Sequence, residues 1–473
     1  MEATNHITNA HELQLMSMNL ANNYTLVNNI DLAPSLTNKS EMWKDNSTAV
    51  NYSSYVGSFV PVGKNSTPNP NTTAFVGTFD GLGHTVDHLT IKINSTALTD
   101  SVGLFGYVNT TIGGLRNIGV TNASIDITGG AFTVSHVGVL AGIVRGGVDN
   151  AYATGTVNVS SSVANANMRA GIGGLIGEMN VNGTAGTATT TNSYANVSVD
   201  ASVAGSQFKY VGGLVGYMAG NLSNSYATGS VIGFDAVGGL IGATDTGSGS
   251  ILRSFASGAV TGQKYGVGGL VGYNRITIGD SYASGQVNAT GSGSSGAAGG
   301  LVGVNKGAIS NSYATSLINA STWNSSSASF YSAFTSGSGA SYVAGALIGA
   351  DFGSSGMQAL TNNFYDNTVN GSMAGIGMKN TLGLAGNTNG YSNDSATAAV
   401  GKTTADMKAL AAFSGTTPAW NVVTDTSLSN VYPQLRWATT GLSAGSSVWV
   451  MAVAPSNSNS NSNSNSNSNS NSN

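Results

Sequence analysis

The stretch that decides the fold reads Val211-Gly-Gly-Leu-Val-Gly216, followed after a short gap by Asn224-Ser-Tyr-Ala-Thr-Gly-Ser-Val231. The phrase returns with small changes as Val237-Gly-Gly-Leu-Ile-Gly242 with Arg253-Ser-Phe-Ala-Ser-Gly258, Val267-Gly-Gly-Leu-Val-Gly272 with Asp280-Ser-Tyr-Ala-Ser-Gly285, and Ala298-Gly-Gly-Leu-Val-Gly303 with Asn311-Ser-Tyr-Ala-Thr315. Its central leucines, from Leu214 to Leu301, follow one another at intervals of 26 to 31 residues. A fixed period of this size indicates a stacked repeat architecture.

Looser copies of the phrase extend the array on both sides, at Val102–Gly106, Val137–Gly142, Ile172–Gly177 and Ala344–Gly349. Several glycines per unit disfavour helices, whereas short β-branched runs bounded by Gly and Asn favour about three short strands per unit. A propeller blade needs about forty residues, and leucine-rich repeats need more leucines than the one found here. The sequence therefore predicts an all-β fold, a parallel β-helix (β-solenoid) with short helical or irregular caps.

Alternation along Ser225–Val231 predicts which side chains point into this core. Ala227 and Val231 share the inward face with Gly229, and the intervening residues point outward. An outward aromatic recurs as Tyr152, Tyr194, Tyr226, Phe255, Tyr282 and Tyr313. Two residues before each ring stands Asn150, Asn192, Asn224, Arg253, Asp280 or Asn311. Stacked coils would bring these rings into a ladder, and Asn would adopt the left-handed conformation at a bend.

Composition excludes several classes of function. Only 8% of the 473 residues are charged, the net charge is −4, and there is no cysteine. No basic stripe is available for nucleic acid, and neither disulfides nor thiolate metal sites can form. No run is long and apolar enough for a membrane span, and Met1–Asn5 lacks the character of a signal peptide.

We divide the chain into four parts. Residues 1–100 form N-terminal coils and a cap, with a helix capped by Asn9 that carries Leu13 and Met16 on one face, and a polar insertion at 34–73. Residues 101–370 form the repeat β-helix. Residues 371–440 supply C-terminal loops and a cap, and residues 441–473 form a low-complexity Ser-Asn linker or tail.

At this point the motifs resemble a known family. The Gly-Gly-Leu-Val-Gly phrase followed by Asn-Ser-Tyr-Ala-Thr-Gly resembles the GLUG-motif repeat of bacterial surface proteins. The flanking motifs Ile7–Leu13, Phe79–His84 and Tyr432–Trp437 are similar to the repeat region of filamentous-haemagglutinin-type adhesins exported by two-partner secretion. The resemblance implies a right-handed β-helix on a bacterial surface, an outer-membrane transporter for export, and no catalytic residues.

Catalytic and metal-binding patterns are weak. Asp235 and Asp245 flank one Gly-Gly-Leu phrase, but we interpret them as solvated loop ends rather than as a glycosidase pair. His84 and His88, near Asp80 and Asp87, are too far apart along a strand to share an ion, so we assign them turn and strand-edge roles. We predict no catalytic, cofactor or metal site.

Two features leave a functional option open. The aromatic ladder would offer a platform for sugar rings if it were exposed, although we favour a packing role for it. Candidate glycosylation sites are Asn46, Asn65, Asn94, Asn196 and Asn288.

We expect a non-enzymatic extracellular adhesin segment, a stalk that displays loops such as 34–73 and 320–342 to a host or bacterial receptor or glycan. The alternatives are a carbohydrate-active β-helix enzyme, a lyase or hydrolase, and a purely structural surface-layer or matrix protein.

Overall fold

The structure is a computed structural model that divides into two compact units, residues 1–404 and 405–473. It describes residues 5–37, 58–64, 73–93, 101–128, 136–160, 169–179, 188–202, 208–245, 249–291, 296–320, 342–352, 360–380, 391–392, 399–408, 422–424, 432–435 and 449–451. The predicted loop at 320–342 falls almost wholly outside these residues.

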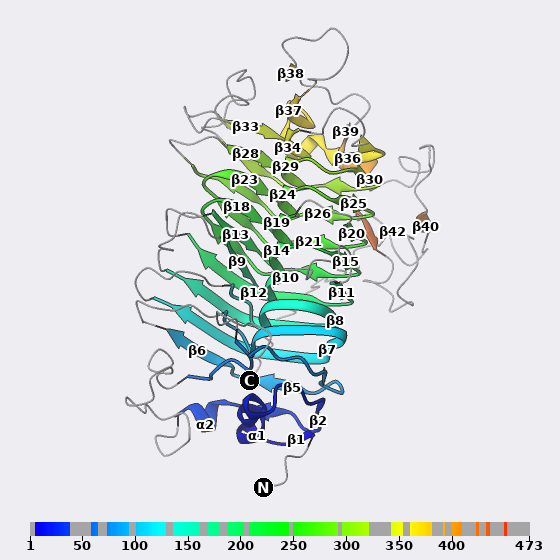
Figure 1. The fold of residues 1–473 in the computed structure, drawn as a ribbon. Coiled ribbons are helices and arrows are strands. Elements are labelled where there is room, and N and C mark those ends of the chain that lie inside the picture. Colours follow the sequence, from blue (N-terminus) through cyan, green and yellow to red (C-terminus); the bar gives the residue numbers. More distant parts are fainter. Residues whose placement is uncertain are drawn as a thin grey trace, which may run out of the picture. The chain divides into compact units, whose positions relative to one another are not determined.

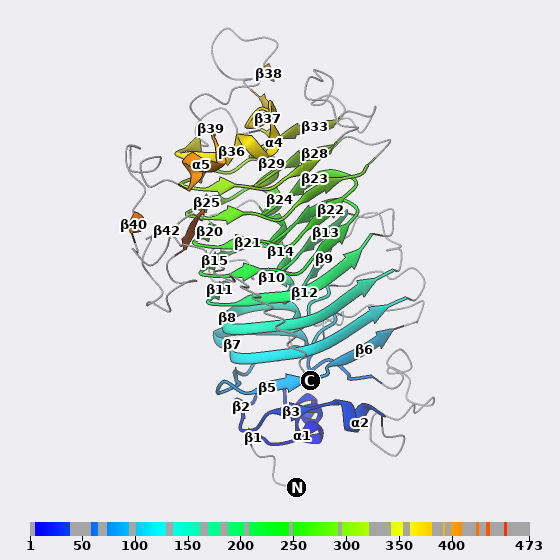
Figure 2. The same cartoon turned by 180° about the vertical axis from the view of Figure 1, so that it is seen from behind.

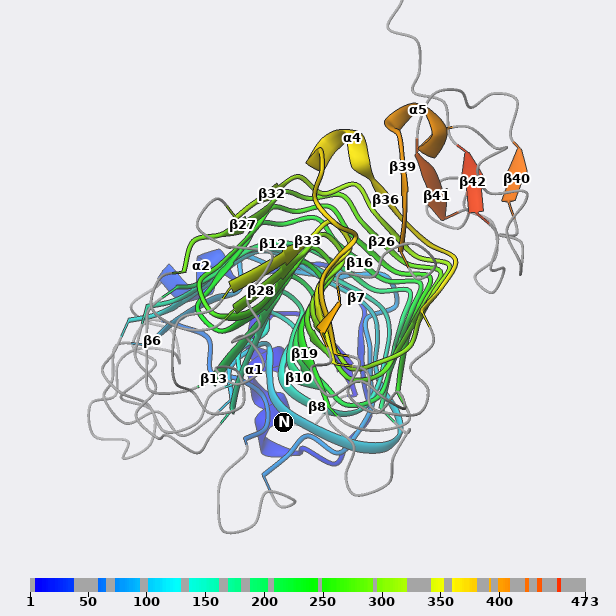
Figure 3. The same ribbon diagram turned by 90° about the horizontal axis from the view of Figure 1, so that it is seen from above.

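The first unit is a parallel β-solenoid, which confirms the predicted fold class (Figures 1 and 2). Its strands form a 33-stranded sheet and a six-stranded sheet, and all but one of their pairings are parallel. Viewed along the stack, equivalent strands of successive coils lie over one another, as β27 (Val287–Ala289) and β32 (Ile318–Asn319) do (Figure 3).

The N-terminal coils contain β1 (His6–Ile7), α1 (Ala10–Leu15), the 3-10 helix η1 (Met16–Met18), β2 (Tyr24–Leu26), β3 (Ile30–Asp31), α2 (Ala33–Thr37), β4 (Phe79–Asp80), β5 (Thr85–Asp87), β6 (Thr90–Ile93), β7 (Phe105–Ile127) and β8 (Ala141–Val159). The next coils contain β9 (Arg169–Gly173), β10 (Ile176–Met179), β11 (Thr189–Thr191), β12 (Tyr194–Ala201), β13 (Phe208–Gly212), β14 (Val215–Met218), β15 (Asn221–Ser223), β16 (Tyr226–Ala227) and β17 (Val231–Gly233).

The following coils contain β18 (Ala236–Gly238), β19 (Ile241–Thr244), β20 (Ser250–Leu252), β21 (Phe255–Ala256), β22 (Val260–Gly262), β23 (Tyr265–Gly268), β24 (Val271–Asn274), β25 (Thr277–Gly279), β26 (Tyr282–Ala283), β28 (Gly296–Gly299), β29 (Val302–Asn305), β30 (Ile309–Ser310) and β31 (Tyr313–Ala314). The last coils contain β33 (Tyr342–Gly345), β34 (Ile348–Asp351), β35 (Leu360–Thr361), β36 (Asn363–Asp366), α4 (Asn367–Asn370), β37 (Ile376–Asn380), β38 (Tyr391–Ser392) and β39 (Ala399–Lys402). Helix α5 (Thr404–Met407) follows in the chain, where the first unit ends and the second begins.

Each regular coil carries five short strands, as β13 to β17 show, rather than the predicted three. The difference arises because each coil is interrupted at more points than the predicted three bends. One break is the Gly-Gly pair, and another is a residue with positive φ such as Asn224, at 50°. Asn150, Asn192, Asn224, Arg253, Asp280 and Asn311 all have φ between 48° and 53°, which confirms the predicted left-handed bends.

The core is one hydrophobic cluster that runs through the first unit from Ile7 to Ala399. The central leucines are fully buried, and Leu214 N–H donates to Leu240 O at 2.9 Å, as Leu240 does to Leu270. Ala227 and Val231 point inward while Thr228 and Ser230 are exposed, as the alternation predicts. Helix α1 adds Leu13 to the core and the 3-10 helix η1 adds Met16, and the Asn9 side chain accepts from Glu12 N–H as the cap of α1.

Three predicted boundaries differ from the structure. Within the predicted insertion 34–73, residues 58–64 belong to the core, because the short apolar run Phe59–Val62 buries Phe59 and Val62 completely. Within the predicted loops 371–440, β37 and β39 pair with β34 and β36, so coil stacking continues to Lys402.

The second unit contains β40 (Val422–Thr424), β41 (Pro433–Leu435) and β42 (Trp449–Met451) in a three-stranded sheet. Trp449 and Leu435 are fully buried. The predicted tail 441–473 therefore includes a strand, since the apolar run around Trp449 has surface to bury, whereas the Ser-Asn repeat lies outside the described residues.

Candidate functional site

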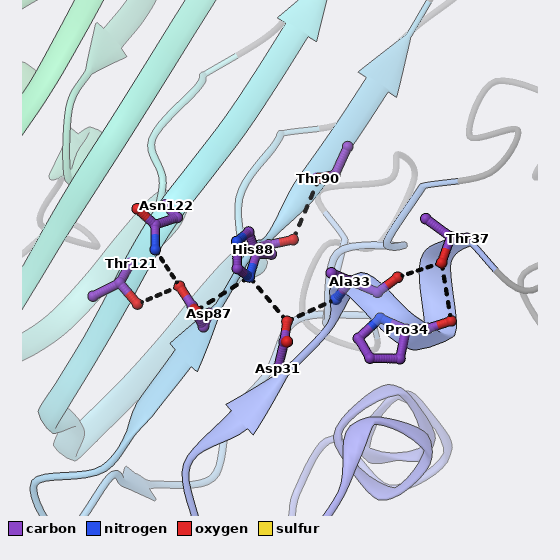
Figure 4. Close-up of polar contacts among 9 residues, drawn as sticks. All are labelled: Asp31, Ala33, Pro34, Thr37, Asp87, His88, Thr90, Thr121 and Asn122. Carbon is purple, nitrogen blue, oxygen red and sulfur yellow. Dashed lines mark hydrogen bonds and ion pairs between the residues drawn. The ribbon is translucent and has the colours of Figure 1, made fainter.

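A polar cluster lies on the outside of the first coils, where β3, β5 and the residue after β5 bring Asp31, Asp87 and His88 together (Figure 4). Asp31 ends β3 and Asp87 ends β5, and the parallel register places the two aspartates opposite each other. Thr121 of β7 occupies the same position in the following coil. The cluster is thus a product of stacking, because these residues are far apart in the sequence.

His88 lies between the two carboxylates. Its φ of 56° turns the chain immediately after β5, and its Nδ1 lies 2.9 Å from Asp31 Oδ1 and 3.1 Å from Asp87 Oδ2. Two carboxylates in adjacent coils repel each other, and an Nδ1–H donor between them relieves that repulsion. The arrangement joins consecutive coils through side chains.

Hydrogen bonds stabilise the ionised form of Asp87. Burial raises the pKa of Asp87, but hydrogen bonds from Thr121 and Asn122 and the neighbouring His88 outweigh burial and hold that pKa below its ordinary value. Thr121 Oγ1 donates to Asp87 Oδ1 at 2.7 Å, and Asn122 Nδ2 donates to the same oxygen at 2.8 Å.

The donor set of two carboxylates and an imidazole is one that Zn²⁺ accepts, and the three donor atoms lie within 4.8 Å of one another. However, a metal would have to displace the contacts that already occupy them. Asp31 Oδ1 also accepts from Ala33 N–H at 2.9 Å, and His88 Nδ1 contacts both carboxylates. The cluster is explained as a hydrogen-bonded link between coils.

Asp80 and His84, the other two residues considered with Asp87 and His88 as metal ligands, make separate contacts. Asp80 pairs with Arg116 at 2.8 Å, and His84 Nδ1 lies 3.2 Å from Asn29 Oδ1. Comparing positions along one strand missed Asp31, which lies in the previous coil. Aligning Ile30-Asp31 with Val86-Asp87 would have found Asp31, because each segment has an inward apolar side chain followed by an outward aspartate.

The aromatic ladder is formed. The ring centres of Tyr152, Tyr194, Tyr226, Phe255, Tyr282 and Tyr313 follow one another at 4.8 to 5.0 Å with interplanar angles of 4° or less. Tyr152 lies over Gly119, where a Cβ would stand 2.3 Å from Tyr152 Cζ. At the other end, Phe364 follows Tyr313 in register, and Lys402 Nζ lies 4.8 Å from its ring centre.

Stacking changes what the ladder can offer to a ligand. The faces of the internal rings are covered by their neighbours, so ring edges and phenolic hydroxyls are the parts left to meet a ligand. Tyr152, Tyr194, Tyr226 and Phe255 are half-buried, whereas Tyr282 and Tyr313 are buried. Burial, with a neighbouring phenol in each case, raises the pKa of Tyr194 and Tyr226. The glycan platform stays a prediction, now restricted to ring edges.

The other candidate residues are placed as follows. Asn196 is exposed on β12, whereas Asn288 is half-buried. Asn288 Nδ2 donates to Thr261 Oγ1 at 3.3 Å, and Asn288 Oδ1 accepts from Asn319 Nδ2 at 2.9 Å. Asn46, Asn65 and Asn94 lie outside the described residues. Asp235, which we expected at a solvated loop end, is buried, and Asp245 is half-buried after β19.

One internal ladder was missed from the sequence. Ser193, Ser225, Ser254, Ser281 and Ser312 are fully buried. The Oγ of each serine after the first accepts the amide N–H of the serine before it, at 3.2 to 3.3 Å. Each Oγ also donates to the carbonyl two residues earlier. The recurring Ser before each ring was the available signal, but serine has no strong preference for a β-sheet core.

No helix in the described parts of the chain is long and apolar enough to cross a membrane.

Comparison with known proteins gives three findings. The GLUG motif matches residues 209–232. Halomucin from Haloquadratum walsbyi is 34% identical over 161 residues, which are 34% of this chain but span only 1% of halomucin. A crystal structure of a Bacteroides ovatus protein proposed to be an immunoglobulin A1 protease covers 66% of this chain and 77% of its own, with 21% identity and a TM-score of 0.39, too low to support a conclusion. The chain thus carries the GLUG motif within a parallel β-solenoid.

Proposed function

We propose that this chain is a non-enzymatic, extracellular segment of an adhesin, in which the solenoid acts as a stalk that displays attachment surfaces. The observation that carries this proposal is the main hydrophobic core, which extends from Ile7 to Ala399 and is built from coils that repeat similar side chains at the same position. Such stacking yields a quasi-one-dimensional body whose stability comes from contacts between neighbouring coils.

The cell-surface location is supported by the GLUG motif and by the similarity to halomucin. Export through an outer-membrane transporter by two-partner secretion is part of the same proposal and rests on the resemblance of the flanking motifs. The partner would be a host or bacterial surface receptor or glycan.

The absence of enzymatic activity is also a proposal. Asp235 and Asp245, the carboxylates that flank one Gly-Gly-Leu phrase, make a poor glycosidase pair because Asp235 is buried and does not face a substrate. Surface carboxylates such as Asp80 are engaged by Arg116 and Asn117. These contacts support a structural role for the acidic residues.

The test uses the full chain, fluorescently labelled, on bacterial and epithelial cells, on matrix proteins and on a glycan array. Reducing-sugar release is measured on every polysaccharide that binds. We expect saturable binding without product release. A variant in which residues 321–341 are replaced by a Gly-Ser sequence of equal length asks whether that loop makes the contact.

A double variant, Tyr194→Phe with Tyr226→Phe, tests the ladder separately, because it keeps the stack and removes two hydroxyls. Loss of glycan binding in this variant would assign binding to the ring edges. Product release from a polysaccharide would favour the carbohydrate-active enzyme instead. Ordered self-assembly without any binding would favour the structural surface-layer protein.

A further inference from the structure

A second histidine, His136, is buried at the outer corner of the solenoid, with only 6% of its surface exposed. It precedes Val137, which forms isolated parallel bridges with Val102 of one coil and Ile172 of another. Both ring nitrogens are engaged. Gly171 N–H donates to His136 Nδ1 at 3.1 Å, and His136 Nε2 lies 3.0 Å from Glu178 Oε2.

These two contacts fix the protonation state of the ring. An Nδ1 that accepts an amide hydrogen carries no proton, so the imidazole is neutral and its proton is on Nε2, directed at the carboxylate. A side-chain nitrogen here accepts an amide hydrogen that in a regular parallel ladder would go to a backbone carbonyl. A Cβ on Gly171 would clash first with the carbonyl group of Gly177 and would also stand 3.2 Å from Nδ1, so the site has room for the ring but not for a side chain at residue 171.

Charged and titratable groups near this contact lie on β7, β8 and β10, and also on β13 and β14, whose Tyr210 and Tyr217 are in register with Gly171 and Glu178. Glu178 belongs to β10, and its side chain is 12% exposed. Tyr107 of β7 lies under Arg145 of β8, whose guanidinium carbon is 5.4 Å from the ring centre. Burial raises the pKa of Tyr107, Arg145 lowers it and Glu178 raises it, so the phenol is neutral at neutral pH. Of these groups, Glu178 is the one that contacts His136.

We infer that His136 is an acid-sensitive contact between coils, which releases the Gly171 amide of β9 when the imidazole takes up a second proton. That proton, taken from solvent, goes to Nδ1, which then presents an N–H to the N–H of Gly171 and can no longer accept it. At the same time the contact between Nε2 and Glu178 becomes an ion pair. Acid would therefore open the backbone hydrogen bond while the side-chain contact holds the ring in place, which gives a local and reversible loosening.

The test is amide hydrogen exchange of the full chain at about pH 7 and about pH 5, corrected for the intrinsic dependence of exchange on pH. We expect protection of the Gly171 amide to fall about tenfold at the lower pH, the effect of one lost hydrogen bond, and to return on neutralisation. The equivalent strand β18, whose Val237 occupies the position of Ile172 two coils further on, is the internal control and should not change.

The matched variant is His136→Asn, whose amide oxygen can accept from Gly171 N–H in place of Nδ1 but cannot take up a proton. It should show the same protection at both pH values.

Equal protection of Gly171 at both pH values in the unaltered chain would overturn the inference, as would an equal loss in His136→Asn. Should that variant fail to fold, ¹⁵N spectra of the imidazole in the unaltered chain decide. Protonation of Nδ1 must then coincide with the loss of Gly171 protection, and exchange that increases at a different pH would also overturn it.

Discussion

At the second glycine of each Gly-Gly-Leu phrase, neighbouring coils approach closely enough to exclude a side chain. A Cβ on Gly174, Gly213, Gly239 or Gly269 would stand 2.1 Å from the carbonyl oxygen of the next coil. In the last copy of the phrase alanine takes this place, as Ala346. An earlier copy carries Val139 at this place, so the glycine is a steric requirement of the coils from Gly174 onward and not of every coil.

We predict that Gly239→Ala lowers the free energy of unfolding by about 3 kcal/mol, because a backbone carbonyl has to move to admit the methyl group. Urea denaturation measures the change. Gly279→Ala is the control, since the nearest atom to its added Cβ is Leu252 Cδ2 at 3.0 Å, the end of a flexible side chain. Equal losses in the two variants would contradict the steric explanation.

Asp80 gives a prediction on pH. Burial raises the pKa of Asp80, but hydrogen bonds from Asn117 and Leu82 N–H and the Arg116 guanidinium outweigh burial and hold that pKa below its ordinary value. A carboxyl with a lowered pKa adds stability above its unfolded pKa, and this contribution is lost as pH falls through the folded value.

Asp80→Asn should therefore flatten the fall in stability between about pH 5 and pH 2, measured by thermal melting at a series of pH values. Glu2→Gln provides a comparison for a general loss of negative charge. If Asp80→Asn lost stability at low pH as steeply as the unaltered chain, the contacts of Asp80 with Arg116 and Asn117 would contribute little to stability.

At the scale of the strand, the aromatic column is a stabilising element in its own right. Tyr226 stacks on Tyr194 and Phe255 at 4.8 Å on each side. Tyr226→Ala removes both contacts, and we expect a loss of about 3 kcal/mol in unfolding free energy. Tyr226→Phe should cost less than about 0.5 kcal/mol, because the next coil already carries a phenylalanine at this position.

Chemical denaturation of the two variants side by side checks this prediction. A similar loss in both would mean that the hydroxyl, and not the ring, stabilises the column.

The sequence predicts those elements whose signal recurs in every repeat unit. The aromatic rings and the Asn bends recur at one position in every unit, so a single alignment of units finds them. The division of each coil into five strands depends on where bends interrupt backbone pairing. The repeat length of the sequence does not determine those places. The contacts of His88 with Asp31 and of Gly171 with His136 depend on register between particular coils, and register is fixed only in three dimensions.

Across the whole molecule, the coils differ in length but keep one register. Tyr226 and Phe255 are 29 residues apart, and Tyr313 and Phe364 are 51 apart, yet both pairs are aligned. The described strands β33 and β34 keep their register with β28 and β29 despite the additional residues. The excursion predicted at 320–342 lies within the second interval.

Helix α1 closes the N-terminal end of this core, and we predict that Leu13→Ala loosens the first coils selectively. Removing a buried leucine costs about 2–5 kcal/mol, and in a stack with contacts only between neighbours that cost falls first on the coils nearest the helix. Hydrogen exchange should increase in β1, β2 and β4 and stay unchanged in β19 and β24.

Met18→Ala is the matched control, because Met18 is 83% exposed and its truncation removes a comparable apolar group outside the core. Exchange that increased equally along the whole stack would show that the solenoid unfolds as one cooperative unit.

The tolerance of unequal coil lengths has an evolutionary consequence. Recombination between the DNA stretches that encode successive similar units would insert or delete an entire turn while leaving the recurring leucines and aromatic rings stacked on one another. Such a gene could change the reach of its product in discrete steps without designing a new interior, and related strains would then differ chiefly in the number of turns.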